Sequence, residues 1–321
     1  MRRKFLLGLI LLALAGHVSA DWMWAKGNLH THTTFSDGRD PAEAVAEWYK
    51  SHGYQFLVLS DHDKLTDPAP FDKPGDDFIL IPGEEIGVVG SRLPIHANAF
   101  GISKTVNSPM RSVTPGRSIR DLVDLIVDSG GIPQVNHPNW MYSLDHRELL
   151  QIRHPFILEI ANMASDDNNN FGSASRLSNE QVWDVLLSDG RMVYASASDD
   201  MHMLQGTEKD FLPGRGWVVA RVPELTPSAI LKALASGDFY ASIGVEIADL
   251  ACDRKVFRVK VKPQEGKTYL IRFIGKWGEI LQETVGDSAT YKISGDESYV
   301  RCKVIASDGR VAWTQAFRLG K

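Results

Sequence analysis

Histidines and carboxylates recur in this sequence directly after short apolar runs that are typical of β-strands. Helical patterns separate these runs, for example over residues 40–53 and 118–129. Strands that alternate with helices indicate βαβ units and a parallel sheet, in which residues following successive strands gather at one edge. Residues 26 to about 243 are therefore predicted to form an α/β domain, and the strand count suits a barrel of about seven strands better than an open sheet.

The first motif is His30-Thr31-His32, with Asp37 five residues later. Side chains at positions i and i+2 of a strand lie on the same face, so both imidazoles can reach one metal ion. Asp37 lies in the turn Ser36-Asp37-Gly38, which can fold back toward them. An HxH pair followed by such an Asp-Gly turn indicates a metal site.

Five more motifs supply further candidate ligands: His62, either Glu84 or Glu85, His96, His137, and the pair Asp200 and His202. A carboxylate can bridge two ions, so one of the two glutamates is the expected bridge. His96 precedes most of its apolar run, and taken alone it is equally typical of a core histidine. A shared metal centre explains all six motifs better than six separate structural roles. Imidazole and carboxylate ligands without cysteine favour Zn, Mn or Fe.

Taken together, the segments HTH…SDG, SDHD, PGEE, HANAFG, NHPN and DDMH resemble the PHP (polymerase and histidinol phosphatase) superfamily of metallohydrolases. The later segments PGRGW and GDFYAS, and the β domain after them, are similar to its exported branch of carbaryl-hydrolase-like proteins. The resemblance implies a distorted (β/α)₇ TIM-like barrel with two or three divalent ions at its C-terminal mouth. The family pattern favours Glu85 over Glu84 as the carboxylate shared between ions. The ligands it implies are His30, His32, Asp37, His62, Glu85, His96, His137, Asp200 and His202.

The predicted function is hydrolysis of a phosphoester in a small molecule or nucleotide. Two or three ions could lower the pKa of a water to near neutrality, and the hydroxide would attack the substrate. His202, His62 or Asp61 could protonate the leaving group, and Asp61 could instead orient an imidazole or form a turn. Arg176 and Arg215 are candidate phosphate donors, although surface positions explain them as well.

Two other functions remain open. The same site could hydrolyse a carbamate, ester or amide. A non-catalytic periplasmic metal-binding module is the third possibility, and nine candidate ligands exceed what one stored ion needs. The sequence does not predict the substrate or the oligomeric state.

The first twenty residues have the pattern of a secretory signal peptide. Three basic residues precede an apolar run of about a dozen, and Val18-Ser19-Ala20 is a cleavage pattern. The run is short for a membrane span, which needs roughly 20 residues. We therefore expect a periplasmic or secreted protein without a membrane anchor. Losing three of 35 basic residues, against 40 acidic ones, changes the net charge from −5 to −8, which argues against stable nucleic-acid binding.

From about residue 244 the pattern changes to alternating runs, over residues 256–261, 269–274 and 299–305. These predict a small antiparallel β domain, similar to a β-sandwich, over residues 244–321. No histidine follows His202, so the chemistry is expected within residues 21–243. Cys252 and Cys302 could pair across neighbouring strands or remain buried thiols.

Overall fold

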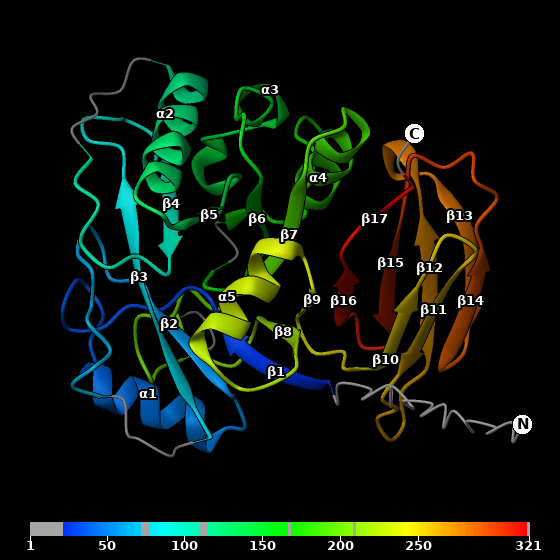
Figure 1. Ribbon diagram of the computed structural model, residues 1–321, viewed down its shortest axis with the longest axis horizontal. Helices are drawn as coiled ribbons and strands as arrows, with labels where there is room; N and C mark the ends of the chain where they lie inside the picture. Colours follow the sequence, from blue (N-terminus) through cyan, green and yellow to red (C-terminus); the bar gives the residue numbers. More distant parts are fainter. Residues whose placement is uncertain (1–21, 72–76, 109–113, 166–167, 208–209, 320–321) are drawn as a thin grey trace, which may run out of the picture.

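The computed structural model describes residues 22–71, 77–108, 114–165, 168–207 and 210–319 (Figure 1). The predicted signal peptide, residues 1–20, lies outside the described residues. Within the described part of the chain, no helix is long and apolar enough to cross a membrane.

Seven strands form the first part of one large sheet. In chain order they are β1 (Met23–Asn28), β2 (Phe56–Leu59), β3 (Ile79–Gly87), β4 (His96–Phe100), β5 (Ile132–Val135), β6 (Phe156–Asn162) and β7 (Val193–Ser198). They lie side by side in this order. β1, β2 and β3 pair in parallel, as do β5, β6 and β7, but β4 is antiparallel to both neighbours. The predicted α/β fold is confirmed, whereas the all-parallel sheet is wrong at β4.

The short link between β3 and β4 explains this difference. Residues 88–95 contain no helix among them. A parallel pair needs a crossover of a dozen or more residues, whereas antiparallel strands can be joined by a short turn.

The seven-stranded barrel is not confirmed, because the sheet is not closed. β8 (Trp217–Val222) pairs antiparallel with the edge of β1 that a closing strand would need, and β9 (Phe239–Ser242) pairs with β8. β7 does not pair with β1 in the described residues. One isolated β-bridge, between Thr31 and Met201, joins the segment after β1 to the segment after β7. The fold is therefore a mixed α/β fold built on one large sheet.

Five helices cover this sheet: α1 (Ala42–Ser51), α2 (Pro115–Asp128), α3 (His146–Leu149), α4 (Asn179–Ser188) and α5 (Pro227–Ser236). α2, α3 and α4 follow one another along β4 to β7 (Figure 1). α4 begins with a capping box, in which the side chains of Ser178 and Gln181 each bond the backbone of the other residue. The helical pattern expected from residue 40 begins as α1 at Ala42, after Pro41. The carboxylate of Asp40 accepts a hydrogen bond from the backbone N–H of Leu204.

The C-terminal strands form two packed antiparallel layers. Their bounds are β10 (Ile247–Cys252), β11 (Val256–Val261), β12 (Tyr269–Ile274), β13 (Ile280–Val285), β14 (Ser288–Lys292), β15 (Tyr299–Ala306), β16 (Val311–Thr314) and β17 (Phe317–Arg318). β10, β11 and β14 make a separate sheet, whose Phe257 contacts Phe273 of β12 across a shared core at 5.6 Å between ring centroids. Cys252 and Cys302 are free thiols.

The large sheet continues across the expected domain boundary near residue 243. β16 pairs with β9, and β15, β12 and β13 follow on the far side of β16. Two short 3₁₀ turns, η1 (Trp140–Tyr142) and η3 (Lys276–Gly278), lie in connecting segments. The second packs against α4 through a hydrogen bond from the Trp277 N–H to the Ser188 hydroxyl, at 2.7 Å.

Candidate metal centre

The structure gathers the predicted ligands at one edge of the large sheet. Most of them follow a strand, as the sequence predicted, and Glu85 lies within β3. His96 is the first residue of β4. Because β4 is antiparallel, its beginning lies beside the ends of β3 and β5, so His96 reaches the same edge as the others. The contacts below link all nine: His30, His32, Asp37, His62, Glu85, His96, His137, Asp200 and His202.

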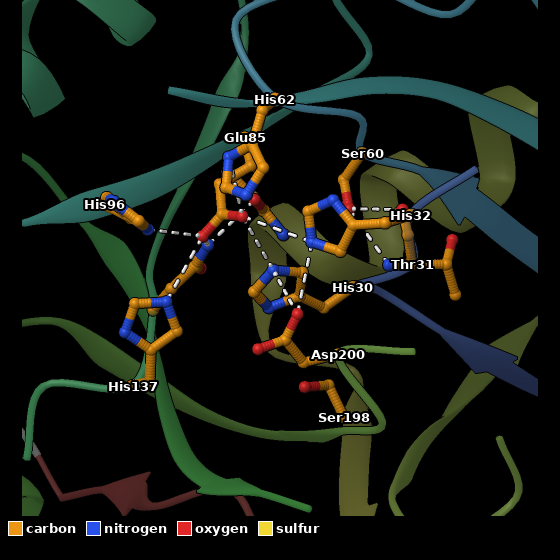
Figure 2. Close-up of polar contacts among 12 residues, drawn as sticks. His30, Thr31, His32, Ser60, His62, Glu85, His96, His137, Ser198 and Asp200 are labelled. Carbon is orange, nitrogen blue, oxygen red and sulfur yellow. Dashed lines mark hydrogen bonds and ion pairs between the residues drawn. The ribbon is translucent and has the colours of Figure 1, made fainter. Parts of the chain in front are cut away.

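Glu85 lies at the centre of this cluster (Figure 2). Its carboxylate oxygens lie 3.1–3.3 Å from one nitrogen each of His30, His32, His62, His96 and His137. Oε2 faces the first three imidazoles and Oε1 faces the last two. A carboxylate whose two oxygens face different sets of imidazoles is arranged as a bridge between two ions.

Asp200 approaches the same imidazoles from the β7 side. Its Oδ1 lies 3.2 Å from His30 Nε2 and 3.1 Å from His32 Nε2. Asp37 lies at the outer side, with Oδ2 3.5 Å from His202 Nε2 and 3.7 Å from His62 Nε2. The ligands therefore extend from a buried interior to the solvent.

Four buried polar atoms of the predicted ligands lack a hydrogen-bond partner among the described residues: His30 Nε2, His32 Nε2, His137 Nδ1 and Asp200 Oδ1. Buried polar atoms left in this state are costly and call for an explanation. Ligand atoms around a tetrahedral ion, at about 2.0–2.1 Å from it, lie about 3.3 Å apart. The separations of 3.1–3.2 Å from His30 Nε2 and His32 Nε2 to the carboxylate oxygens are close to this value. The residues present therefore fit divalent metal ions.

Among the residues that the structure describes, three groups of side chains have the spacing to hold an ion. They are His32, Asp37, His62 and His202; His30, His32 and Glu85; and His62, Glu85 and His96. Each group shares members with another, so they describe adjoining positions within one centre.

The backbone is strained at two of the ligands. His137 and Asp200 have φ values of 25° and 48°, in the left-handed region that side chains other than glycine rarely adopt. Such strain persists where the surroundings impose it, and it clusters at functional sites.

The carboxylates of the cluster are held in their charged form. Burial would raise the pKa of Glu85, but the charges of His30, His96 and His62 outweigh burial and hold this pKa well below its usual range. Burial likewise opposes ionisation of Asp200, and neighbouring imidazoles hold its pKa well below normal. Both groups are thus available as anionic ligands.

Glu84 lies on the opposite face of β3 from Glu85. The regular pairing of β3 with β4 continues through both residues, so strand alternation is not broken. The Glu84 carboxylate is buried and accepts the Val106 N–H at 3.0 Å. Burial raises its pKa to about 7. The sequence left open which of the two acids enters the site, and it is Glu85 that lies among the imidazoles.

Asp61 is also buried, but its carboxylate contacts hydroxyl groups and a backbone N–H instead of an imidazole. It accepts hydrogen bonds from Thr33, Ser36 and Thr66, at 2.5–3.0 Å. These bonds fix the loop that carries Asp37.

The two predicted arginines have partners of their own. Arg176 lies 3.5 Å from Asp145 and over the ring of Tyr142. The guanidinium of Arg215 donates to the Asp210 carbonyl at 2.9 Å.

Sequence reasoning missed a buried acid behind the ligands, Glu159 of β6. Its Oε1 lies 3.0 Å from His30 Nδ1, and its Oε2 accepts the His137 backbone N–H at 2.7 Å. The available signal was a single acid inside the apolar run Phe156–Ile160. Asn136 was missed as well, and its amide donates to Glu85 Oε1 at 2.8 Å.

No protein-family model and no curated protein matches this sequence. The structure is similar to that of a two-domain protein from Bacteroides vulgatus that contains a predicted PHP-like metal-dependent phosphoesterase. The TM-score is 0.51 and the identity 15%, over 92% of this chain and 96% of that chain. An amidohydrolase from Chromobacterium violaceum, solved with sulfate and no metal, has a TM-score of 0.40 and 16% identity, over 56% of this chain and 88% of that chain.

The first of these likenesses shows a shared fold. At 15% identity it shows a similar fold and nothing finer, so the division of this chain into two domains stays a prediction. The narrower assignment to an exported, carbaryl-hydrolase-like branch stays a prediction.

Proposed function

We propose that this protein is a metal-dependent hydrolase that cleaves a phosphoester in a small molecule or nucleotide. One observation carries the proposal: His30 Nε2, His32 Nε2 and Asp200 Oδ1 are buried, lack hydrogen-bond partners among the described residues, and converge beside Glu85. Bound divalent ions would lower the pKa of a water and neutralise charge that develops during hydrolysis. The nine clustered side chains would hold two or three such ions, of Zn, Mn or Fe.

The outer side chains define where a substrate can approach. The side chains of His30 and His32 are fully buried, whereas those of His202, His62 and Asp37 are 19%, 29% and 57% exposed. A substrate therefore meets this outer edge first.

His62 and His202 lie at this edge, and either would give a proton to the leaving group. Asp61 is not placed for that role. Its carboxylate is buried and already accepts hydrogen bonds from Thr33, Ser36 and Thr66.

Hydrolysis of a carbamate or carboxylic ester is the second candidate, and the aromatic rings beside the centre favour it. The Trp140 ring lies 4.9 Å from that of His137, and the Phe211 ring lies 5.0 Å from that of His202. Aromatic walls suit an uncharged, partly apolar substrate. Arg176, a candidate phosphate donor, is instead engaged by Asp145.

Turnover of a substrate panel tests both candidates. The mature chain, loaded with Mn or Zn, is assayed against phosphomonoesters, phosphodiesters, carbamates and carboxylic esters. We expect metal-dependent turnover of at least one phosphoester class. Selective turnover of carbamates or esters would replace the first candidate with the second. Stoichiometric metal binding without turnover of any class would leave a metal-binding module.

We also propose that the mature protein is exported, begins at residue 21 and acts without a nucleic-acid partner. N-terminal sequencing of the protein recovered from the periplasm or medium tests the cleavage. Recovery of the uncleaved chain from the cytoplasm would contradict it.

A further inference from the structure

The buried carboxylate of Glu159 is hydrogen-bonded to two of the predicted ligands and, through Asn162, to a third. It lies in β6 and is fully buried. Four donors converge on its two oxygens. Oε1 lies 3.0 Å from His30 Nδ1 and also accepts the Ser198 hydroxyl. Oε2 accepts the His137 backbone N–H at 2.7 Å and the Asn162 amide at 2.9 Å.

These bonds reach ligands on three different strand ends. His30 follows β1 and His137 follows β5. Asn162 donates to Asp200 Oδ2 at 3.0 Å as well as to Glu159, so it links Glu159 to the ligand that follows β7. One carboxylate thus connects three of the nine predicted ligands.

The contact with His30 determines which of its nitrogens faces the centre. A carboxylate can only accept, so the proton of a neutral His30 lies on Nδ1 and points toward Glu159. Its Nε2 then presents a lone pair toward Glu85 and Asp200, each 3.2 Å away. A metal-binding imidazole needs this arrangement, and carboxylates commonly impose it from behind.

The contact with His137 acts on the backbone. His137 has a φ of 25°, which is unfavourable for a residue with a side chain. Its N–H donates to Glu159, and this bond helps to hold the strained turn in which the imidazole reaches Glu85.

We propose that Glu159 is the positioning residue of the metal centre, and that it sets the affinity for the ion nearest His30. This inference rests on the proposed metal function. Because His30 occurs only in the group with His32 and Glu85, that position is the one expected to weaken when Glu159 is changed. The group of His62, Glu85 and His96 lacks a residue that contacts Glu159.

Two substitutions separate positioning from packing. Glu159→Gln preserves the shape but offers one accepting oxygen, so two of the four donors lose their acceptor. Glu159→Asp leaves a small gap but keeps two accepting oxygens. If acceptors matter, Glu159→Asp retains more metal than Glu159→Gln. If Glu159 only fills space, the order is reversed.

The matched control is Glu84→Gln, which changes another buried glutamate of the same sheet, in β3. Glu84 accepts a single N–H, from Val106, and an amide oxygen can replace it there.

The experiment titrates the metal-free mature chain and its variants with Co(II), followed by the visible spectrum and by competition with a chelator. We expect Glu159→Gln to weaken one ion roughly 10–100-fold and to change its spectrum, while the other binding step and the Glu84→Gln variant stay close to wild type. Equal affinity of Glu159→Gln and wild type would overturn the inference, as would equal weakening of every ion together with lower thermal stability. Failure of the wild-type chain to bind any ion would instead overturn the proposed metal function.

Discussion

Two clusters of buried charged side chains in this protein differ in how fully they satisfy one another. One joins β15 to α4, and the other is the candidate metal centre around Glu85. In the first, Arg301 donates to both oxygens of Asp184, at 2.7 and 2.6 Å, and lies 2.9 Å from Glu180. The Tyr299 hydroxyl completes it by donating to Asp184 at 3.0 Å. Its opposite charges and donors are matched almost completely, with Nη1 of Arg301 left over among the described residues.

The metal centre has the same short distances but a different pattern of donors. Its contacts join imidazole nitrogens and carboxylate oxygens. Four of its buried atoms lack hydrogen-bond partners within the described residues: His30 Nε2, His32 Nε2, His137 Nδ1 and Asp200 Oδ1. The comparison shows that proximity of opposite charges does not identify a binding site. A candidate binding site is indicated by buried ligand atoms that converge without hydrogen-bond partners among the described residues. A network whose charges and donors are matched indicates a structural contact.

Glu85→Gln is expected to have the largest effect, because it removes the shared anion of the centre. The metal content should fall and turnover should drop about a thousandfold or more, since bound ions supply several kcal/mol of stabilisation to the transition state. Elemental analysis and the rate on the best substrate of the panel measure both.

Glu84→Gln is the matched control for this prediction. Glu84 faces away from the imidazoles, so its variant should keep most of the metal and of the turnover. A dead, metal-depleted Glu84→Gln beside an active Glu85→Gln would place the bridging ligand one residue earlier in β3.

The sequence predicted which side chains gather at one edge better than it predicted the fold, because the rules for strand ends are local. His30 and His32 share a face by strand periodicity alone, and polar residues after strands gather at one edge. Glu159 could not be recognised in this way. It is a single acid in an apolar strand, and its partners, His30 and His137, come from two other strands.

The sequence did not predict that the sheet stays open, because the pattern of a strand does not show which strands pair with it. The apolar run of β4 has the same appearance in a parallel and an antiparallel pair. Pairing of β8 with β1 is a tertiary choice, and it occupies the edge that closure would need. The sequence analysis treated residues 244–321 as a separate domain. It therefore did not predict the pairing of β16 with β9 or the ion pair between Arg301 and Asp184.

Arg301→Met tests the other side of the comparison. It leaves the buried Asp184 without its cation, whereas Glu180 keeps Lys303 at 2.5 Å. We expect a loss of about 3–5 kcal/mol in the free energy of unfolding. Metal content per folded chain should not change. Denaturant unfolding and elemental analysis provide the two measurements.

The control for Arg301→Met is the surface pair of Arg272 and Glu283, whose side chains are 32% and 44% exposed. Arg272→Met should change the free energy of unfolding by no more than about 1 kcal/mol. Loss of metal in Arg301→Met at an unchanged unfolding free energy would mean that this cluster supports the metal centre directly.

Metal removal should destabilise the chain less than Arg301→Met does, and it acts on the candidate metal centre alone. Ions that bind only the folded chain stabilise it by about 2.7 kcal/mol when the free ion is at a hundred times its dissociation constant. Chelation should therefore lower the melting temperature of the wild-type chain by on the order of 5 °C. The same treatment should hardly affect Glu85→Gln, which has already lost its shared ligand, but should still destabilise Arg301→Met by the wild-type amount. Calorimetry of the three proteins, with and without chelator, measures these differences. A melting temperature that stays the same after verified removal of the ions would show that the buried acceptors around Glu85 are stable without a cation.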